Sequence, residues 1–308
     1  MLSKENQKHN LISYEIEDDV LTLKEVLLDK LNMSVRFISK IKKDKSIFVN
    51  GQFKRLNYEV KKGDLIKIKI KEDPNNFECE NLRINVLYED FDIILVNKPP
   101  FMVVHPTKSH PKGTLANGLM FYLRDKKEKP RIRFVNRLDM NTSGLLVVAK
   151  NAYAHHILSE DMSKNLVTKK YLTIVKGVVK KDFGTIDAPI YRPSDDSIKR
   201  IVHENGQKSI THFKVIDRLK DATVIEVILE TGRTHQIRVH MNYIGHPIIG
   251  DELYGYVDEN LIKRQALHAI ELEFKQPRTK ENLKFKADIP EDMKDLIKKL
   301  KEDENANT

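Results

Sequence analysis

The sequence of 308 residues contains a single cysteine, Cys79, so the chain cannot form an internal disulfide. It has no Cys-x-x-Cys pair and no His-Glu-x-x-His motif. His235 and His240 lie five positions apart, whereas two histidines on one face of a zinc-binding helix lie four apart. We therefore expect no metal site, and the low cysteine content favours a reducing, cytoplasmic setting.

Long apolar runs and phosphate-binding loops are also missing. No run approaches the roughly 18 apolar residues of a membrane-spanning helix, and the segment from Met1 to Asn10 lacks the apolar core of a signal peptide. There is no G-x-x-x-x-G-K-[S/T] loop and no G-x-G-x-x-G loop, so nucleotide hydrolysis and dinucleotide binding have no support. Because no G-x-S-x-G elbow occurs, Ser143 is interpreted as a turn or helix-cap hydroxyl.

What the chain does have is length and positive charge. Its 308 residues predict two domains, one of them large enough for a substantial core. The net charge of +9 and the pI of about 9.2 favour an anionic partner, with nucleic acid first. A generally lysine-rich composition would give the same charge, so charge alone does not decide between these alternatives.

Residues 12–71 predict a small unit of two helices and a few strands. Thr22 and Glu25 have the spacing of a capping box at the start of the first helix, and Ser34 can cap the second. Alternating isoleucine and lysine over residues 66–71 predicts a strand. One face of the second helix is basic, which suits contacts to RNA phosphates, although a merely solvated face has the same pattern. The residues of this basic face are Arg36, Lys40, Lys42 and Lys43.

Residues 72–81 are acidic and aperiodic and predict a linker, which leaves residues 82–302 for the second domain. There, strands are expected at 84–87, 93–96, 171–176, 210–216, 223–229 and 283–287, and helices at 114–123, 151–162, 235–244 and 290–301. Residues 1–10 and the tail from Glu302 are expected to be disordered. Strands outnumber helices and do not alternate regularly with them, which predicts an α+β fold on a mixed sheet.

The most informative stretch of this second domain is Phe134 to Lys150. Arg137 and Asp139 lie in a loop just before the apolar run Leu145 to Ala149, which predicts a buried strand. A charged pair at the mouth of a buried strand is a common place for chemistry. An Arg–Asp pair that only ties the loop down is the simpler interpretation of these two residues alone.

Two further stretches carry candidate residues. Tyr171 lies at the start of a predicted strand within Lys169 to Gly177, and Arg238 lies on a predicted helix within Thr231 to Met241. Taken singly, an ordinary strand aromatic and a solvated helix charge explain them equally well. Their significance depends on whether they occur together with the loop that contains Asp139.

Together, these stretches resemble the motifs of RNA pseudouridine synthases. The resemblance rests on five stretches in the expected order: 97–106, 134–150, 170–177, 232–241 and 265–269. It is strongest to the RluA/RluD type of bacterial enzymes that act on large-subunit ribosomal RNA. Residues 22–51 and 60–64 are similar to the S4 RNA-binding domain with which such enzymes often begin. Asn136 departs from the pattern, because a histidine usually precedes Arg-Leu-Asp, and only local loop contacts are expected to differ.

The resemblance implies a small S4-like α/β domain followed by a catalytic domain on a large mixed, mostly antiparallel β-sheet flanked by helices and loops. It implies isomerisation of uridine in RNA: the base leaves ribose through N1, turns and rejoins through C5, without metal or cofactor. The expected RNA is ribosomal, with transfer RNA as the alternative, and a monomer is expected.

The resemblance also implies roles for particular residues. Asp139 would be the catalytic carboxylate, acting in its ionised form by attack on ribose C1′, by attack on base C6 or by proton abstraction. Arg238 would pair with Asp139, and Tyr171 would stack on the target base and help to move a proton from C5. Leu267 would pack behind the Tyr171 ring. Arg137 would fill the place of a uridine turned out of its stack, for which a planar guanidinium is suited.

Two other classes of function are weighed against this one. A catalytically silent RNA-binding or ribosome-assembly protein on the same fold would not need Arg137, Asp139, Tyr171 and Arg238 together, yet all four are present. A hydrolase of small molecules would need a nucleophile–base pair or a metal motif, and the sequence contains neither.

Overall fold

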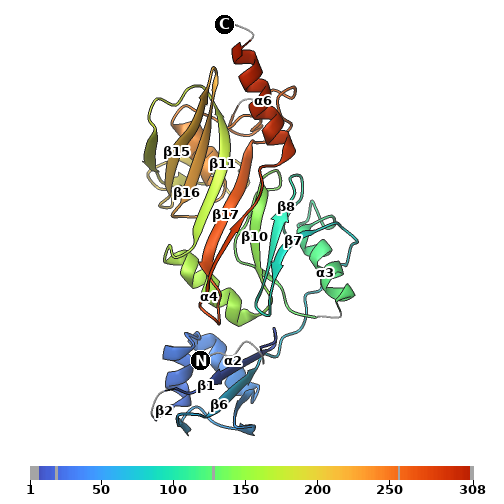
Figure 1. Cartoon of the computed structure of the whole chain (residues 1–308), viewed down its shortest axis with the longest axis vertical. Helices are drawn as coiled ribbons and strands as arrows, with labels where there is room; N and C mark the ends of the chain where they lie inside the picture. The colour runs from blue at the N-terminus through green and yellow to red at the C-terminus, as the bar shows by residue number, and fades with distance from the viewer. Residues whose placement is uncertain (1–6, 18–19, 127–128, 256, 306–308) are drawn as a thin grey trace.

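The computed structural model describes residues 7–17, 20–126, 129–255 and 257–305. A small amino-terminal part and a larger sheet-based part are joined by the segment that follows residue 69 (Figure 1). The described residues begin in the small part and end at the far end of the large part. The segment 72–81, predicted as a linker, contains no helix or strand.

The small part combines a four-stranded sheet, a two-stranded sheet and two helical segments. The four-stranded sheet has the order β1 (Leu11–Glu15), β6 (Leu65–Lys69), β3 (Ile47–Val49), β4 (Gln52–Phe53). The shorter sheet pairs β2 (Leu21–Thr22) with β5 (Glu59–Val60). The helical segments are α1 (Leu23–Glu25), which continues as one π-helical turn (Val26–Lys30), and α2 (Val35–Lys43).

The capping residues that the sequence predicts are present in both helical segments. Thr22 and Glu25 form a reciprocal capping box, and the Ser34 hydroxyl accepts a hydrogen bond from the Phe37 amide at 3.2 Å. The turn between β3 and β4 uses Asn50 and Gly51, whose φ angles of 47° and 83° suit a tight hairpin. Alternation along β6 buries its isoleucines and turns its lysines outward, as expected.

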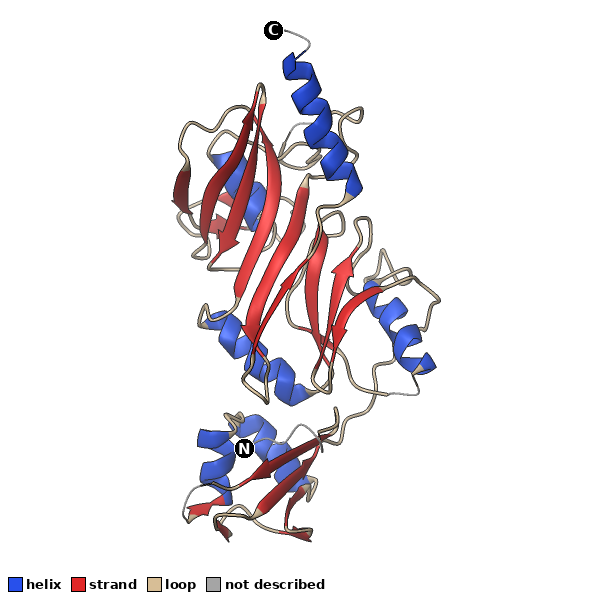
Figure 2. Cartoon of the chain, in the orientation of Figure 1, coloured by secondary structure: helices blue, strands red, loops and turns tan. Residues whose placement is uncertain are grey.

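The large part is built on a ten-stranded mixed sheet (Figure 2). Its main path runs β12 (Phe183–Asp187), β15 (Ile210–Leu219), β16 (Ala222–Leu229), β11 (Thr168–Lys176), β17 (Leu267–Lys275), β10 (Ser143–Ala149), β8 (Ile93–Lys98), β7 (Asn85–Glu89). Two strands lie off this path: β18 (Asn282–Lys286) pairs with β17, and β9 (Arg133–Phe134) pairs with β10. Only β10 and β17 pair in parallel among the described strands of this sheet, so the predicted mixed, mostly antiparallel α+β fold is confirmed.

Helices and a short hairpin surround the sheet. The helices are α3 (Leu115–Asp125), α4 (Ala152–Ser163), α5 (Gln236–Tyr243) and α6 (Glu291–Asn305), and the hairpin pairs β13 (Ile190–Tyr191) with β14 (Ile201–Val202). Thr114 and Asn151, the first residues of two of the predicted helices, cap α3 and α4 through their side-chain oxygens. The main hydrophobic core contains residues from β8, β10, β11, β16, α3 and α6.

The structure corrects several boundaries. Strand β17 was not predicted, although it lies in the middle of the sheet between β10 and β11. The prediction that the tail is disordered from Glu302 onward is wrong in part, because α6 continues to Asn305. Lys298 and Glu302 lie 3.8 Å apart on successive turns of this helix. At the other end, residues 1–6 lie outside the described residues. Lys8, however, forms a β-bridge with Leu11, so the expected disorder does not extend through residue 10.

The two parts contact each other through buried groups. Tyr153 and Ile157 of α4 belong to the hydrophobic cluster of the small part. Arg278 of the large part is fully buried, pairs with Asp92 at 2.8 Å and donates to the Leu11 carbonyl at 2.7 Å. These contacts fix how the small part lies on α4. The S4 assignment and the domain limits 12–71, 72–81 and 82–302 stay predictions.

Candidate active site

The loop that bears Asp139 is held by its backbone. The Asp139 carbonyl accepts from the Thr142 amide at 3.1 Å, which closes a turn. Lys98 and Arg264 donate to the carbonyls of the two residues after Asp139, at 3.0 and 3.2 Å. Because both cations are about 1% exposed, these bonds satisfy carbonyls that water does not reach. The loop therefore presents Asp139 from a fixed backbone.

Lys98 has an unusual environment for a lysine. Its ammonium also donates to the carbonyls of Pro99 and Met102, at 2.8 and 2.9 Å. Burial and the charge of Arg264 lower the pKa of Lys98 to about 7, while Asp139 opposes this shift. Lys98 thus donates to three carbonyls, one of which, that of Met140, belongs to the Asp139 loop.

Gly144 explains how the start of β10 meets β17. Its φ angle of 115° lies in a region that L side chains rarely adopt, and a Cβ atom there would collide with the backbone of Ala269. Gly144 pairs with Ala269 in the parallel register of the two strands. The Ser-Gly pair therefore begins a strand, and the Ser143 hydroxyl bonds His268 Nδ1 at 2.8 Å instead of capping a helix.

Arg238 bridges two carboxylates. Its Nη1 donates to Asp139 Oδ2 at 3.0 Å, and its Nε and Nη2 donate to the two oxygens of Asp251 at 2.7 and 2.8 Å. Asp251 is fully buried, whereas the Asp139 side chain is 29% exposed. Burial acts to lower the pKa of Arg238, but the bonds and charges of Asp251 and Asp139 outweigh it and raise that pKa. Asp251 thus anchors the guanidinium that holds Asp139.

His235 adjoins the same carboxylate. It precedes α5 with a φ angle of 58°, and its Nε2 lies 3.9 Å from Asp139 Oδ2. The Tyr254 hydroxyl accepts from the Arg200 amide at 2.7 Å and lies 2.8 Å from His235 Nδ1. Burial lowers the pKa of His235, although Asp139 opposes the shift. The sequence alone suggests no role for His235 other than that of a metal ligand, which its spacing to His240 disfavours.

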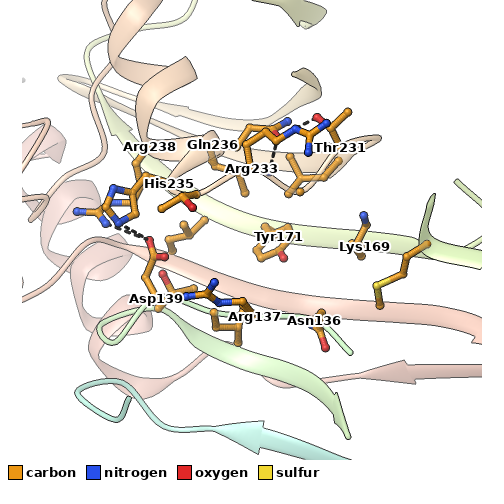
Figure 3. A pocket seen from close by; sticks show the side chains of 18 of the residues that line it. Asn136, Arg137, Asp139, Lys169, Tyr171, Thr231, Arg233, His235, Gln236 and Arg238 are labelled. Carbon is orange, nitrogen blue, oxygen red and sulfur yellow. Dashed lines mark hydrogen bonds and ion pairs between the residues drawn. The ribbon is translucent and has the colours of Figure 1, made fainter. Parts of the chain in front are cut away.

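A cavity of about 850 Å³ opens over this group. Five residues that the sequence predicts to act together all line it. They are Arg137, Asp139, Tyr171, Arg238 and Leu267. Arg137 and Asp139 come from the loop before β10. In Figure 3, Tyr171 lies between Lys169 and the pair that Asp139 forms with Arg238. Burial and the charge of Asp139 raise the pKa of Tyr171, so its phenol is protonated at neutral pH.

Asn136 has a local role in the loop. Its side-chain oxygen accepts from the Val147 amide at 2.9 Å, and its side-chain nitrogen donates to the Leu145 carbonyl at 3.4 Å. These bonds tie the loop to the edge of β10. The amide in place of the usual histidine thus contacts backbone groups of the neighbouring strand.

The basic face of α2 lies outside this cavity. Its four side chains are exposed, and Lys40 lies 3.7 Å from Glu72. Among the described residues, no cluster of three or more His, Cys, Asp or Glu side chains is arranged to hold a metal ion. The helices of the described ranges include none long and apolar enough to cross a membrane.

Comparison with known proteins defines the class. A family model for RNA pseudouridylate synthases matches residues 92–243, and the chain belongs to this family. YlyB of Bacillus subtilis, named as an uncharacterized RNA pseudouridine synthase, is 44% identical over 265 residues, which cover 84% of this chain and 87% of YlyB. Ribosomal large subunit pseudouridine synthase D of Haemophilus influenzae is 39% identical over 255 residues, 78% of each chain.

Solved structures show the same likeness. The chain named human RNA pseudouridylate synthase domain containing 1 aligns with a TM-score of 0.56 and 28% identity, covering 70% of this chain and 86% of that one. The protein is therefore an RNA pseudouridine synthase of the RluA/RluD type, and it isomerises uridine in RNA. The prediction of enzyme class from the sequence is confirmed.

Proposed function

We propose that Asp139 is the catalytic carboxylate of this isomerisation. One observation carries the proposal: Asp139 Oδ2 is held by Arg238, while Oδ1 has no protein hydrogen bond among the described residues and belongs to a side chain that lines the cavity. A carboxylate must be ionised to act as a nucleophile or a base, and the guanidinium of Arg238 lies 3.0 Å from Oδ2 as its ion-pair partner. Oδ1 is then the atom that faces the substrate.

The surroundings of Tyr171 support a stacking role. Its ring lines the cavity, and its hydroxyl keeps its proton because burial raises the pKa of the phenol. A protonated phenol is a poor acceptor for the proton that leaves C5, whereas its ring can still lie against a uracil. We assign Tyr171 to the base and Leu267, 4% exposed, to the wall behind it.

Arg137 suits the step in which the target uridine leaves its stack. It is exposed at the edge of the cavity, and no hydrogen bond or ion pair fixes its guanidinium among the described residues. Unstacking a base costs a few kcal/mol, which a planar cation in the vacated place would partly offset. This role explains why the arginine stays accessible while Arg238 is buried.

The proposed substrate is large-subunit ribosomal RNA, supported by the likeness to proteins named ribosomal large subunit pseudouridine synthase D. The basic face of α2, on the S4-like domain, would bind phosphates of this RNA. A monomer and a cytoplasmic location stay predictions. Mapping pseudouridines in RNA from cells with and without the gene tests the substrate, and an unchanged map of ribosomal RNA would contradict it.

Replacing Asp139 by asparagine tests the catalytic assignment against a silent RNA-binding protein. The two side chains are nearly equal in size, so Asp139→Asn should keep fold and RNA affinity yet slow single-turnover isomerisation by about 100-fold or more. Asp182→Asn is the matched control, because the Asp182 side chain is exposed beside the edge strand β12 and, among the described residues, bonds only Arg218. Near-normal turnover by Asp139→Asn would refute the assignment.

A further inference from the structure

Lys169 and Lys170 are neighbours on β11 with opposite surroundings. Successive side chains of a strand point to opposite faces, so Lys169 shares the cavity face with Tyr171 while Lys170 lies on the other face. Lys170 lies 3.8 Å from Glu226 and 3.5 Å from Glu271. Lys169 has no carboxylate partner and no hydrogen bond for its ammonium among the described residues.

A comparison with Arg238 makes this absence significant. Both cations line the cavity and both are 8% exposed, yet Arg238 is bonded to two carboxylates. A buried charge without a partner is costly, and burial accordingly lowers the pKa of Lys169. Other cations of the cavity, such as Lys208 and Arg233, are exposed and need no partner because water solvates them. Lys169 alone among these lysines and arginines is both buried and unpaired in the described structure.

We propose that Lys169 binds a backbone phosphate of the RNA, on a nucleotide next to the target uridine. The stem of Lys169 is buried while its ammonium has no protein partner among the described residues; such a group is suited to an anion, and phosphate is the anionic group of RNA. Two residues of strand separate Lys169 from Tyr171 by about 7 Å, so a uridine on Tyr171 brings its neighbouring phosphates within reach. In Figure 3, Tyr171 lies between Lys169 and the pair of Asp139 with Arg238.

The proposal deepens the function proposed above and rests on it for the position of the uridine. It gives Lys169 a positioning role: with its phosphate held, the base is set against Tyr171 and the ribose against Asp139. The same ammonium could instead donate to a carbonyl oxygen of uracil, which is neutral. The two contacts differ in how they respond to salt, because only a phosphate contact releases counterions.

The test is equilibrium binding of the full chain to a transcript of large-subunit ribosomal RNA, between about 50 and 200 mM salt. Lys169→Met should reduce the slope of log affinity against log salt by about 0.7–0.9, the value of one phosphate contact, and Lys169→Arg should retain it. Lys170→Met is the matched control and should leave the slope unchanged. The measured quantity is RNA affinity and not the reaction rate, so failure of the Asp139 assignment would not affect this result.

Stability separates a binding role from a structural one. Because Lys169→Met removes a charge that burial of the side chain disfavours, its denaturant midpoint should equal or exceed that of the wild-type protein. Weaker RNA binding with undiminished stability supports the proposal. An unchanged salt slope refutes it, and lower affinity at an unchanged slope would assign Lys169 to a uracil carbonyl instead.

The position of the phosphate is tested with neutral linkages. Once the modified uridine is mapped, single methylphosphonate linkages on either side of it should weaken wild-type binding at one position. The same linkage should have no effect on Lys169→Met, because the contact is already lost. Additive losses at every linkage would refute the placement beside the target uridine.

Discussion

Arg238→Met is the substitution for which the structure predicts two separable losses. Arg238 is the partner of Asp251, which is fully buried, and of Asp139, which faces the cavity. Methionine keeps an apolar stem of similar length and removes the charge from both carboxylates. The first loss concerns folding and the second concerns catalysis, and each has its own magnitude.

The folding loss comes from Asp251. Besides the two bonds from Arg238, its carboxylate accepts only from the amides of Leu253 and Tyr254, at 3.0 and 3.1 Å, among the described residues. Removing one partner of a buried ion pair costs about 3–5 kcal/mol, because the other charge is left uncompensated. Arg238→Lys should cost less, since an ammonium keeps the charge but cannot form the bidentate bond.

The catalytic loss comes from Asp139. A hydrogen bond to a charged group is worth about 1.5–3 kcal/mol, so losing the 3.0 Å bond should slow the single-turnover rate about 10-fold to 150-fold at neutral pH. An unchanged single-turnover rate would show that the bond from Arg238 to Asp139 contributes nothing to catalysis.

The double substitution Arg238→Met with Asp251→Leu separates the two losses. Removing both members of a buried pair is often close to neutral for stability, so the unfolding free energy should recover while the rate stays low. Guanidinium denaturation measures the unfolding free energy, and single-turnover kinetics measure the rate. If Arg238→Met alone unfolds at the wild-type midpoint, the assignment of Asp251 as a buried anion that depends on Arg238 is refuted.

Two further predictions concern the basic face and a buried histidine. Replacing Arg36, Lys42 and Lys43 by glutamine should weaken RNA binding and flatten its salt slope while sparing turnover at saturating RNA; an unchanged slope would make this face a solvated surface. Burial and the charge of Arg264 lower the pKa of His268 to about 4. The unfolded chain therefore binds more protons between about pH 6.5 and 4. As the pH falls across that range, the unfolding free energy should decrease by up to about 3 kcal/mol. In denaturant titrations, His268→Gln should abolish this contribution to the pH dependence of stability.

Elements with an unbroken pattern could be predicted from the sequence, and β17 shows why others could not. The register between β11 and β17 shifts where Tyr171 faces Ala269 and Lys170 faces Glu271, which leaves Ile270 as an extra residue. Leu267 and Ala269 are buried before this bulge, whereas Leu272 and Phe274 are buried after it. The bulge thus reverses the parity of the apolar positions. A search for simple alternation fails at that point, although the strand lies in the middle of the sheet.

The candidate site likewise contains residues that the sequence identifies and residues that only the structure identifies. Residues within the ordered motifs, such as Asp139, Tyr171 and Arg238, could be named from sequence because those motifs together resemble the motifs of a known enzyme family. Asp251 and Lys98 could not be assigned a function, because their importance comes from burial and from partners distant along the chain. The Arg238–Asp251 pair spans a turn after α5, and the Lys98–Met140 bond joins two strands through their adjoining loops.

Lys169 and Lys170 show this limit most directly. The two residues are identical in type and adjacent in sequence, so composition and charge cannot distinguish them. The pleat of β11 gives one of them two glutamate neighbours and gives the other a buried place without an anion. A charge that the fold leaves unpaired lowers stability unless a ligand compensates it. In an enzyme whose substrate is a polyanion, the buried unpaired lysine is therefore the one expected to contact that substrate.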